Sequence, residues 1–209
     1  MVSDTKQRLI NAAIETLRTR GITGVSARNV AAAAGVNQAL VFYHFGSIDQ
    51  LLAAASATAA ARRVEAFRER FAQVDSLRDL LAAGRELHAA ERETGGVAVL
   101  AQMLAGAQHD PALSAAASAA LELWATEIEQ VLDRVLGGTP LAEFTDIPGL
   151  ARAVSAAFVG IELYEGADPQ GAGAALEALD RLGVLLEVLE GLGPVATRAL
   201  RANLRRRSR

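Results

Sequence analysis

Two short helical segments separated by only two residues place the strongest constraint on the fold, and they occupy residues 26–45. Ser26 predicts the start of the first segment, because its hydroxyl can accept a hydrogen bond from a free backbone N–H. Gly35 predicts its end, since glycine adopts the left-handed conformation that closes a helix. Asn37 is expected to cap the second helix, which ends near Phe45. Two helices joined by a short glycine-containing connection form a helix-turn-helix.

The remaining sequence also predicts helices. Leu9, Ala13 and Leu17 follow the three- and four-residue spacing of one amphipathic helix over residues 4–20. Ser47-Ile48-Asp49-Gln50 is a capping box that opens a helix reaching about residue 72. Further helices are expected over 76–94, 96–108, 111–136, 147–166, 172–192 and 194–206.

The composition agrees with an all-helical class. Apolar residues make up 51% of the chain but aromatic residues only 4%, so most of the apolar content is Ala and Leu, which favour helices. We therefore expect an all-α fold with an N-terminal three-helix helix-turn-helix domain. The long helix that follows residue 47 joins it to a larger helical domain. The expected boundaries are 3–63, with the recognition motif at 26–45, and 64–209.

Charge and residue types exclude several classes of function. Residues 1–50 carry five basic and three acidic side chains, whereas the whole chain has a net charge of −3. A weakly basic N-terminal part joined to an acidic body fits a DNA-binding end. The chain has no Cys, which excludes disulfides and Cys-based zinc sites.

No catalytic, metal or cofactor site is expected. His88-x-x-Glu91 and His109-Asp110 each lack a third partner that the sequence can place. Gly171-x-Gly173 precedes a helix but follows no strand, so it is no nucleotide-binding loop. We do not expect an enzyme.

A helical wheel orients the second helix of the motif. With Val41 facing inward, Ala39 and Tyr43 lie near the opposite side and Leu40 and Phe42 flank them. A helix that presents small, aromatic and polar groups outward suits the major groove of DNA.

The leading end of this helix is expected to contact base edges. Gln38 can bond adenine with two hydrogen bonds, and Ala39 or Leu40 can contact a thymine methyl group. Tyr43 and His44 can donate hydrogen bonds to phosphates, which set register rather than sequence.

Residues 5–52 resemble the N-terminal domain of the TetR family of bacterial regulators. The pattern that carries the resemblance is Ser26-Ala27-Arg28-Asn29-Val30-Ala31, Ala34-Gly35-Val36-Asn37, Val41-Phe42-Tyr43-His44-Phe45-Gly46-Ser47 and Leu51-Leu52. The resemblance implies phosphate contacts from Ser26 and Arg28, base contacts from residues 38–40 and backbone contacts from residues 42–44. The expected DNA-binding set is Ser26, Arg28, Asn37, Gln38, Ala39, Leu40, Phe42, Tyr43, His44 and Ser47.

The chain departs from the family pattern at two positions. Phe42 stands where a Tyr is usual, and Ile48 stands where a Lys is common. The missing hydroxyl and cation should weaken nonspecific affinity and flatten its salt dependence. The N–H groups at the start of the following helix, at Ser47 and Ile48, remain available to a phosphate.

The resemblance implies that the rest of the chain binds a ligand and forms dimers. A mostly apolar pocket with a few polar groups is expected at His88, Val99, Gln102, Met103, Trp124, Phe158 and Glu162. Core packing is the competing interpretation for all of these side chains. For His88 it means a histidine at the edge of the core with a hydrogen-bond partner.

The last two long helices are expected to form the dimer interface. Both are apolar on more than one face, so both sides must be buried, and two copies of each would form a four-helix bundle. The expected interface residues are Ala153, Ala157, Gly160, Leu179, Leu182 and Leu186. The tail carries Arg198, Arg201, Arg205, Arg206, Arg207 and Arg209, either as a solvated end or as an auxiliary contact to nucleic acid.

These observations predict a cytoplasmic homodimer that binds a palindromic operator in double-stranded DNA. A small, mostly apolar effector is expected to release it, which makes it a repressor. The alternative is a DNA-binding regulator controlled by a protein partner or by no ligand. No signal peptide and no apolar run of roughly 18 residues is visible in the sequence, so no membrane partner is expected.

Overall fold

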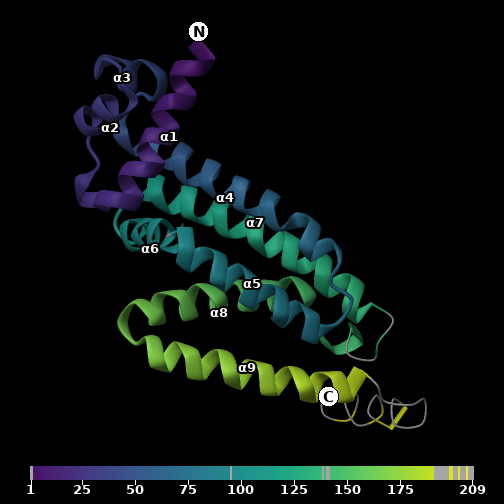
Figure 1. Cartoon of the computed structure of the whole chain (residues 1–209). Coiled ribbons are helices and arrows are strands. Elements are labelled where there is room, and N and C mark those ends of the chain that lie inside the picture. Colours follow the sequence, from purple (N-terminus) through teal and green to yellow (C-terminus); the bar gives the residue numbers. More distant parts are fainter. Residues whose placement is uncertain are drawn as a thin grey trace. The chain divides into compact units, whose positions relative to one another are not determined.

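The computed structural model describes residues 2–94, 96–137, 139, 142–190, 198, 199, 202 and 206. Within these residues every regular element is helical, which confirms the all-α class with its N-terminal helix-turn-helix domain and larger helical C-terminal domain (Figure 1). The elements are α1 (Val2–Arg20), η1 (Ile22–Gly24), α2 (Ala27–Ala34), α3 (Ala39–Phe45), α4 (Ile48–Ala72), α5 (Leu77–Thr94), α6 (Gly96–Ala107), α7 (Pro111–Leu136), η2 (Ala142–Phe144), α8 (Ile147–Ala167) and α9 (Pro169–Glu190). Most of the segment predicted at 194–206, and of the arginine-rich tail, lies outside the described residues.

Helix α9 begins three residues earlier than the sequence predicted. Pro169 occupies its first position, where the fixed φ of proline suits a helix and its missing N–H is not needed. The Asp168 carboxylate accepts a hydrogen bond from the N–H of Gly171 at 2.9 Å. The Asp-Pro pair therefore starts the helix instead of only separating two helices.

The chain folds into two compact units. The first contains Met1–Ala66 and Ala90–Leu123, and the second contains Phe67–Ala89 and Trp124–Arg209. Helices α4, α5 and α7 thus contribute residues to both units. The functional boundary predicted between residues 63 and 64 stays a prediction.

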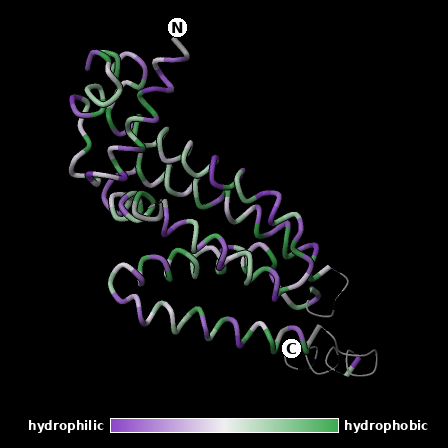
Figure 2. The backbone as a smooth tube through the Cα atoms, in the orientation of Figure 1, coloured by the Kyte–Doolittle hydropathy of each residue, from purple (hydrophilic) through white to green (hydrophobic). Residues whose placement is uncertain are grey.

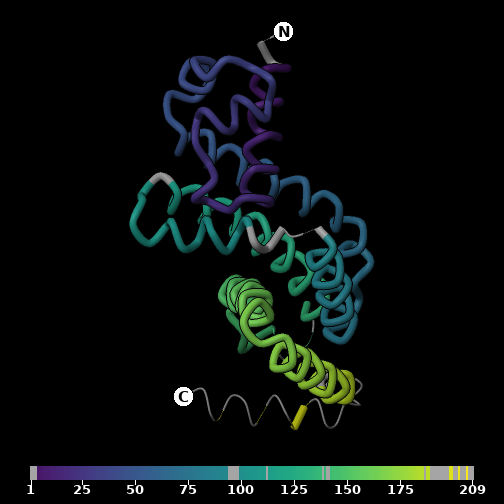
Figure 3. Tube along the Cα trace, turned by 60° about the vertical axis from the view of Figure 1, so that its left-hand side comes forward, coloured from purple at the N-terminus to yellow at the C-terminus, as the bar shows by residue number. Residues whose placement is uncertain are grey.

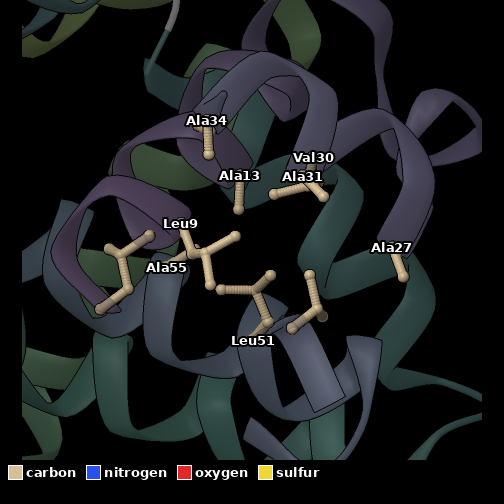
Figure 4. Packing of buried hydrophobic residues seen from close by; sticks show 11 residues of the cluster. Leu9, Ala13, Ala27, Val30, Ala31, Ala34, Leu51 and Ala55 are labelled. Atoms are coloured by element: carbon tan, nitrogen blue, oxygen red, sulfur yellow. The ribbon is translucent and has the colours of Figure 1, made fainter. Parts of the chain in front are cut away.

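The first unit packs α1, α2, α3 and the start of α4 around one apolar cluster. Leu9, Ala13, Val30, Leu51 and Ala55 are buried in it, and Figure 4 shows their side chains meeting between the helices. The small alanines let the helices approach closely, while the leucines fill the centre. The helices of the helix-turn-helix pack on this cluster.

A second cluster of the first unit joins α1 and α4 to α6 and α7. Its buried members are Leu17, Leu52, Val99, Met103, Leu113 and Ala116. The Gln102 side chain accepts a hydrogen bond from the backbone N–H of Ile22, which ties α6 to η1.

The second unit has its own core between the end of α4, α5, the second half of α7 and α8. Phe71, Leu87, Val131 and Leu132 are buried there, and Trp124 meets the Phe71 ring edge-on at 6.2 Å between ring centroids. The guanidinium of Arg134 donates to the backbone oxygens of Phe71 at 2.6 Å and Val74 at 3.2 Å, so it satisfies carbonyls at the end of α4.

Helices α8 and α9 lie along each other in the second unit (Figure 3). Apolar and polar residues alternate along α9 (Figure 2), and several apolar side chains on its outer side are exposed, among them Leu182, Leu185 and Val188.

Among the described helices, α8 is the one that is long and apolar enough to pass a length-and-composition test for a membrane span. Core helices of other proteins pass the same test. This helix also carries Arg152, Glu162 and Glu165, and its side chains contribute to the core of the second unit.

Candidate nucleic-acid interface

The turn of the helix-turn-helix has the local geometry that the sequence predicted. The Ser26 hydroxyl accepts a hydrogen bond from the N–H of Asn29 at 3.1 Å, which confirms it as the N-cap of α2. Gly35 has φ 64° and ψ 39°, the left-handed conformation, and ends this helix. At the start of α2, the Asn29 side chain donates to the Gly24 carbonyl at 2.8 Å and fixes the connection from η1.

The start of α3 differs from the prediction by one residue. The regular helix begins at Ala39 rather than directly after Asn37. The Asn37 side-chain oxygen still accepts from the N–H of Ala39 at 2.8 Å. Asn37 thus satisfies the first free donor through a short turn, and Gln38, already in helical conformation with φ −54° and ψ −33°, supplies no side-chain cap.

The buried and exposed faces of α3 are the ones that the helical wheel assigned. Val41 is fully buried in the core beneath the motif, whereas Tyr43 is 76% exposed and Phe42 is 50% exposed. Ala39 is exposed, and Leu40 is half-buried because its side chain packs partly against the core. The outer strip of α3 therefore offers an aromatic ring with a hydroxyl, a methyl group and part of a leucine.

The other predicted DNA-contacting residues surround this strip. Arg28 and Gln38 are exposed, and His44 is half-buried beside the Tyr43 ring at 5.0 Å between centroids. Ser47 accepts a hydrogen bond from the N–H of Gln50 at 3.1 Å, so its hydroxyl caps α4. Ser26 is exposed although its hydroxyl also caps a helix.

Two basic residues of α1 have local roles that the sequence did not reveal. Arg8 donates from Nη2 to the Ala34 carbonyl at 2.6 Å and approaches the Gly35 carbonyl at 3.4 Å, so it holds the end of α2. Lys6 places its ammonium 5.6 Å from the centre of the Phe45 ring, at the end of α3. No signal within residues 26–45 could have indicated Arg8, because it lies 26 residues from its carbonyl partner.

A second group of polar residues lies in the other unit, between α5 and α8. Nδ1 of His88 is 2.5 Å from a carboxylate oxygen of Glu162, and both side chains are buried. Glu165, one turn further along α8, lies 3.5 Å from Nε2 of the same ring. The sequence singled out His88 and Glu162 but not Glu165, although the three-residue spacing of the two glutamates on one helix was a usable signal.

The remaining predicted ligand contacts fall into two groups. Trp124 and Phe158 pack against the core of the second unit, near the elements that carry His88 and Glu162. Val99 and Met103 are buried in the first unit, and Gln102 is bonded to the backbone of η1. The structure thus brings four of the seven predicted residues into one unit and three into the other.

His88 and Glu91, three residues apart on α5, contact different helices. The Glu91 carboxylate forms an ion pair with Arg63 of α4, whereas His88 turns to α8. Asp110, next to His109, accepts from the N–H of Leu113 at 3.4 Å and caps α7. Both acidic partners are therefore occupied by structural contacts.

The predicted dimer residues lie on exposed or half-buried parts of α8 and α9. Ala153, Ala157 and Gly160 are exposed, Leu179 is half-buried and Leu182 is exposed. The side chain of Leu186 lies outside the described residues. A shallow apolar groove of about 370 Å³ follows the two helices, lined in part by Ala157 and Gly160.

Comparisons with known proteins point to one family. Residues 9–55 match the family described as bacterial regulatory proteins, tetR family. A search of the curated proteins found no match.

Solved structures extend the likeness over most of the chain. The multidrug binding protein EbrR, complexed with imidazole, is 32% identical, with a TM-score of 0.62, over 85% of this chain and 93% of that chain. A protein from Rhodococcus sp. described as a TetR-family transcriptional regulator has a TM-score of 0.72 at 22% identity, over 88% of this chain and 98% of that chain. The transcriptional regulator SCO7518 from Streptomyces coelicolor A3(2) has a TM-score of 0.67 at 23% identity, over 86% and 98% of the two chains.

Proposed function

This chain belongs to the tetR family of bacterial regulatory proteins and is a DNA-binding transcription regulator, and from this premise we propose that it is a homodimeric repressor. A small, mostly apolar effector releases it from a palindromic operator. Regulators of this family are generally not enzymes, and we place this one in the cytoplasm, where its operator lies.

The observation that carries the proposal is the outer strip of α3. Gln38, Ala39 and Tyr43 are exposed on a helix whose opposite side is anchored by the fully buried Val41. A base-reading helix needs both properties, because its contacts discriminate only when the helix is held rigidly. We propose that residues 38–40 contact base edges.

Contacts to the DNA backbone are proposed for residues on and around this strip, which are Ser26, Arg28, Asn37, Phe42, Tyr43, His44 and Ser47. The helix N-termini supply part of these contacts, because backbone N–H groups there attract anions. Two half-sites of the operator are then expected about 34–36 Å apart or a multiple of this distance, as for other dimeric helix-turn-helix proteins.

A DNA retardation assay tests this proposal with the palindrome next to the coding region of the protein itself. Gln38→Ala should weaken specific binding by roughly 5- to 150-fold, which corresponds to about 1–3 kcal/mol for one bidentate base contact. Gln108→Ala, which removes an exposed glutamine outside the motif, is the matched control and should bind like the original chain. Absence of retardation on any palindrome at low salt would refute the proposal.

For the effector we propose the second unit, where His88 and Glu162 supply polar groups beside the aromatic side chains of Trp124 and Phe158. The relative EbrR is a multidrug binding protein solved with imidazole and with proflavin, which supports a small organic ligand. The contacts predicted from Val99, Gln102 and Met103 stay a prediction.

Trp124 is the only tryptophan of the chain and therefore reports on this region without labelling. We expect proflavin, added to the protein in the absence of DNA, to quench its fluorescence in a saturable way. Phe158→Ala should weaken this binding, whereas Phe144→Ala, in η2, should not. Quenching that does not saturate, or that is equal in both variants, would contradict an effector site at this place.

The dimer is proposed to form through α8 and α9. Four exposed apolar side chains of these helices would be shielded from water in a four-helix bundle, namely Leu163, Leu182, Leu185 and Val188. Leu182→Glu combined with Leu185→Glu should yield monomers in analytical ultracentrifugation, while Leu123→Glu, at an exposed leucine of α7, should remain dimeric. A double variant that stays dimeric would place the interface elsewhere.

A further inference from the structure

One histidine and two glutamates of the second unit have their donor atoms close together. Nδ1 of His88 lies 2.5 Å from Oε1 of Glu162, and Nε2 of the same ring lies 3.5 Å from Oε2 of Glu165. One donor atom from each residue lies within 4.8 Å of those of the other two. His88 and Glu162 are buried and Glu165 is half-buried.

The two contacts of the imidazole have different lengths, and the difference assigns their roles. The 2.5 Å contact with Glu162 is a hydrogen bond, which Nδ1–H donates to the carboxylate. In the neutral ring this leaves a lone pair on Nε2. The 3.5 Å separation from Glu165 exceeds the roughly 2.7–2.9 Å of a charge-assisted hydrogen bond.

The longer contact has the length expected between two ligands of one metal ion. Nitrogen and oxygen ligands lie about 2.0–2.2 Å from Zn²⁺ in a tetrahedral site, which places two such ligands roughly 3.3–3.5 Å apart. The 3.5 Å between Nε2 of His88 and Oε2 of Glu165 fits this separation. Glu162 then takes the position of the carboxylate that orients a metal-bound histidine through its other nitrogen.

We propose that His88 and Glu165 bind a divalent transition-metal ion of the Zn²⁺ type, with Glu162 as the residue that positions the imidazole. Imidazole together with carboxylate suits zinc, iron or nickel, whereas Mg²⁺ and Ca²⁺ prefer oxygen ligands alone. The remaining coordination positions are open to water or to an effector.

The site lies in the region proposed for the effector, but metal binding is measured on the protein alone. If the chain failed to bind the metal, DNA binding and the repressor proposal would therefore be unaffected. A loss of DNA binding would in turn say nothing about the metal.

Isothermal titration of the full chain, without a histidine tag and treated with chelator, tests the proposal with Zn²⁺ and with Mg²⁺. We expect one Zn²⁺ per chain and much weaker binding of Mg²⁺. His88→Gln and Glu165→Gln should each weaken Zn²⁺ binding at least about 100-fold, and Glu162→Gln about 10- to 100-fold. His109→Gln, at an exposed histidine, is the matched control and should bind normally.

A second measurement stands even if a variant fails to fold. In the nitrogen NMR spectrum of the unaltered chain, His88 should carry its proton on Nδ1, and its Nε2 signal should shift when Zn²⁺ is added. Absence of Zn²⁺ binding by the unaltered chain, equal loss in His109→Gln, or a Zn²⁺-induced shift confined to other histidines would each overturn the proposal.

Discussion

Arg8 offers the sharpest test of how the DNA-reading helix is held in place. Its guanidinium donates to the Ala34 carbonyl at 2.6 Å and approaches the Gly35 carbonyl at 3.4 Å, the last carbonyls of α2 before the turn. These carbonyls have no partner further along the helix, so a cation there satisfies them. Arg8→Met keeps most of the aliphatic side chain and removes the donors.

The expected loss follows from the type of bond. A hydrogen bond that involves a charged group contributes about 1.5–3 kcal/mol. Since Arg8 is exposed, water competes for both partners, and we expect a loss of about 1–2 kcal/mol. For a chain of this size that lowers Tm by roughly 2–8 °C. Arg18→Met is the matched control, because Arg18 lies on the same helix and its exposed guanidinium pairs with Glu15 of that helix.

Hydrogen exchange locates the effect. The Val36 N–H, which donates to the Ala31 carbonyl across the turn at 3.0 Å, should exchange faster in Arg8→Met and normally in Arg18→Met. The salt dependence of DNA binding separates this role from a phosphate contact, since losing one phosphate contact reduces the slope by about 0.9. An unchanged exchange rate at Val36 together with a reduced slope would refute the positioning role.

Three further predictions follow from the same contacts. Tyr43→Ala should weaken DNA binding in retardation assays, and Tyr43→Phe should reproduce much of that loss if the hydroxyl contacts a phosphate; unchanged affinity in both would contradict the proposed DNA-facing side of α3. Leu51→Ala, at a fully buried position, should lower the free energy of unfolding by about 2–5 kcal/mol in urea titrations, and a loss below about 1 kcal/mol would contradict tight packing there. The hydrogen bond from Arg70 lowers the pKa of the Asp79 carboxyl below its ordinary 3.8, so the pair stabilises the fold fully above that pH and less as the pH falls through the lowered pKa. Asp79→Asn should make the free energy of unfolding depend less on pH below about pH 4. An unchanged pH dependence in that range would exclude this contribution.

Local sequence signals predicted the helix-turn-helix well because its ends are fixed by neighbours in the chain. Ser26 caps with the N–H of Asn29 three residues away, and Gly35 ends the helix through its own backbone conformation. The helical wheel was set with Val41 facing inward, and Val41 is fully buried. The displaced start of α3 shows the limit, since the side chain of Asn37 bonds two residues on and leaves a short turn before the regular helix.

Contacts between distant segments could not be predicted in this way. Nothing near Arg8 indicates that its partner is the end of α2, and nothing near Glu165 indicates a histidine on α5. Met103, which is buried, and Trp124, which is half-buried, were recognisable as apolar positions on helical stripes. Whether such a residue lines a pocket or fills a core depends on which helices surround it, which periodicity does not encode.

The pair His88-x-x-Glu91 shows why spacing alone misleads about chemistry. Three residues apart on one helix, the two side chains are neighbours, and a shared site was the natural interpretation to weigh. The fold instead gives each a partner of opposite character, because Glu91 meets the cation of Arg63 and His88 meets the carboxylate of Glu162. The sequence lacked a third partner for the histidine, and α8 supplies two, 74 residues or more along the chain. The chemistry of this region is therefore decided by the packing of α5 on α8 and not by either helix alone.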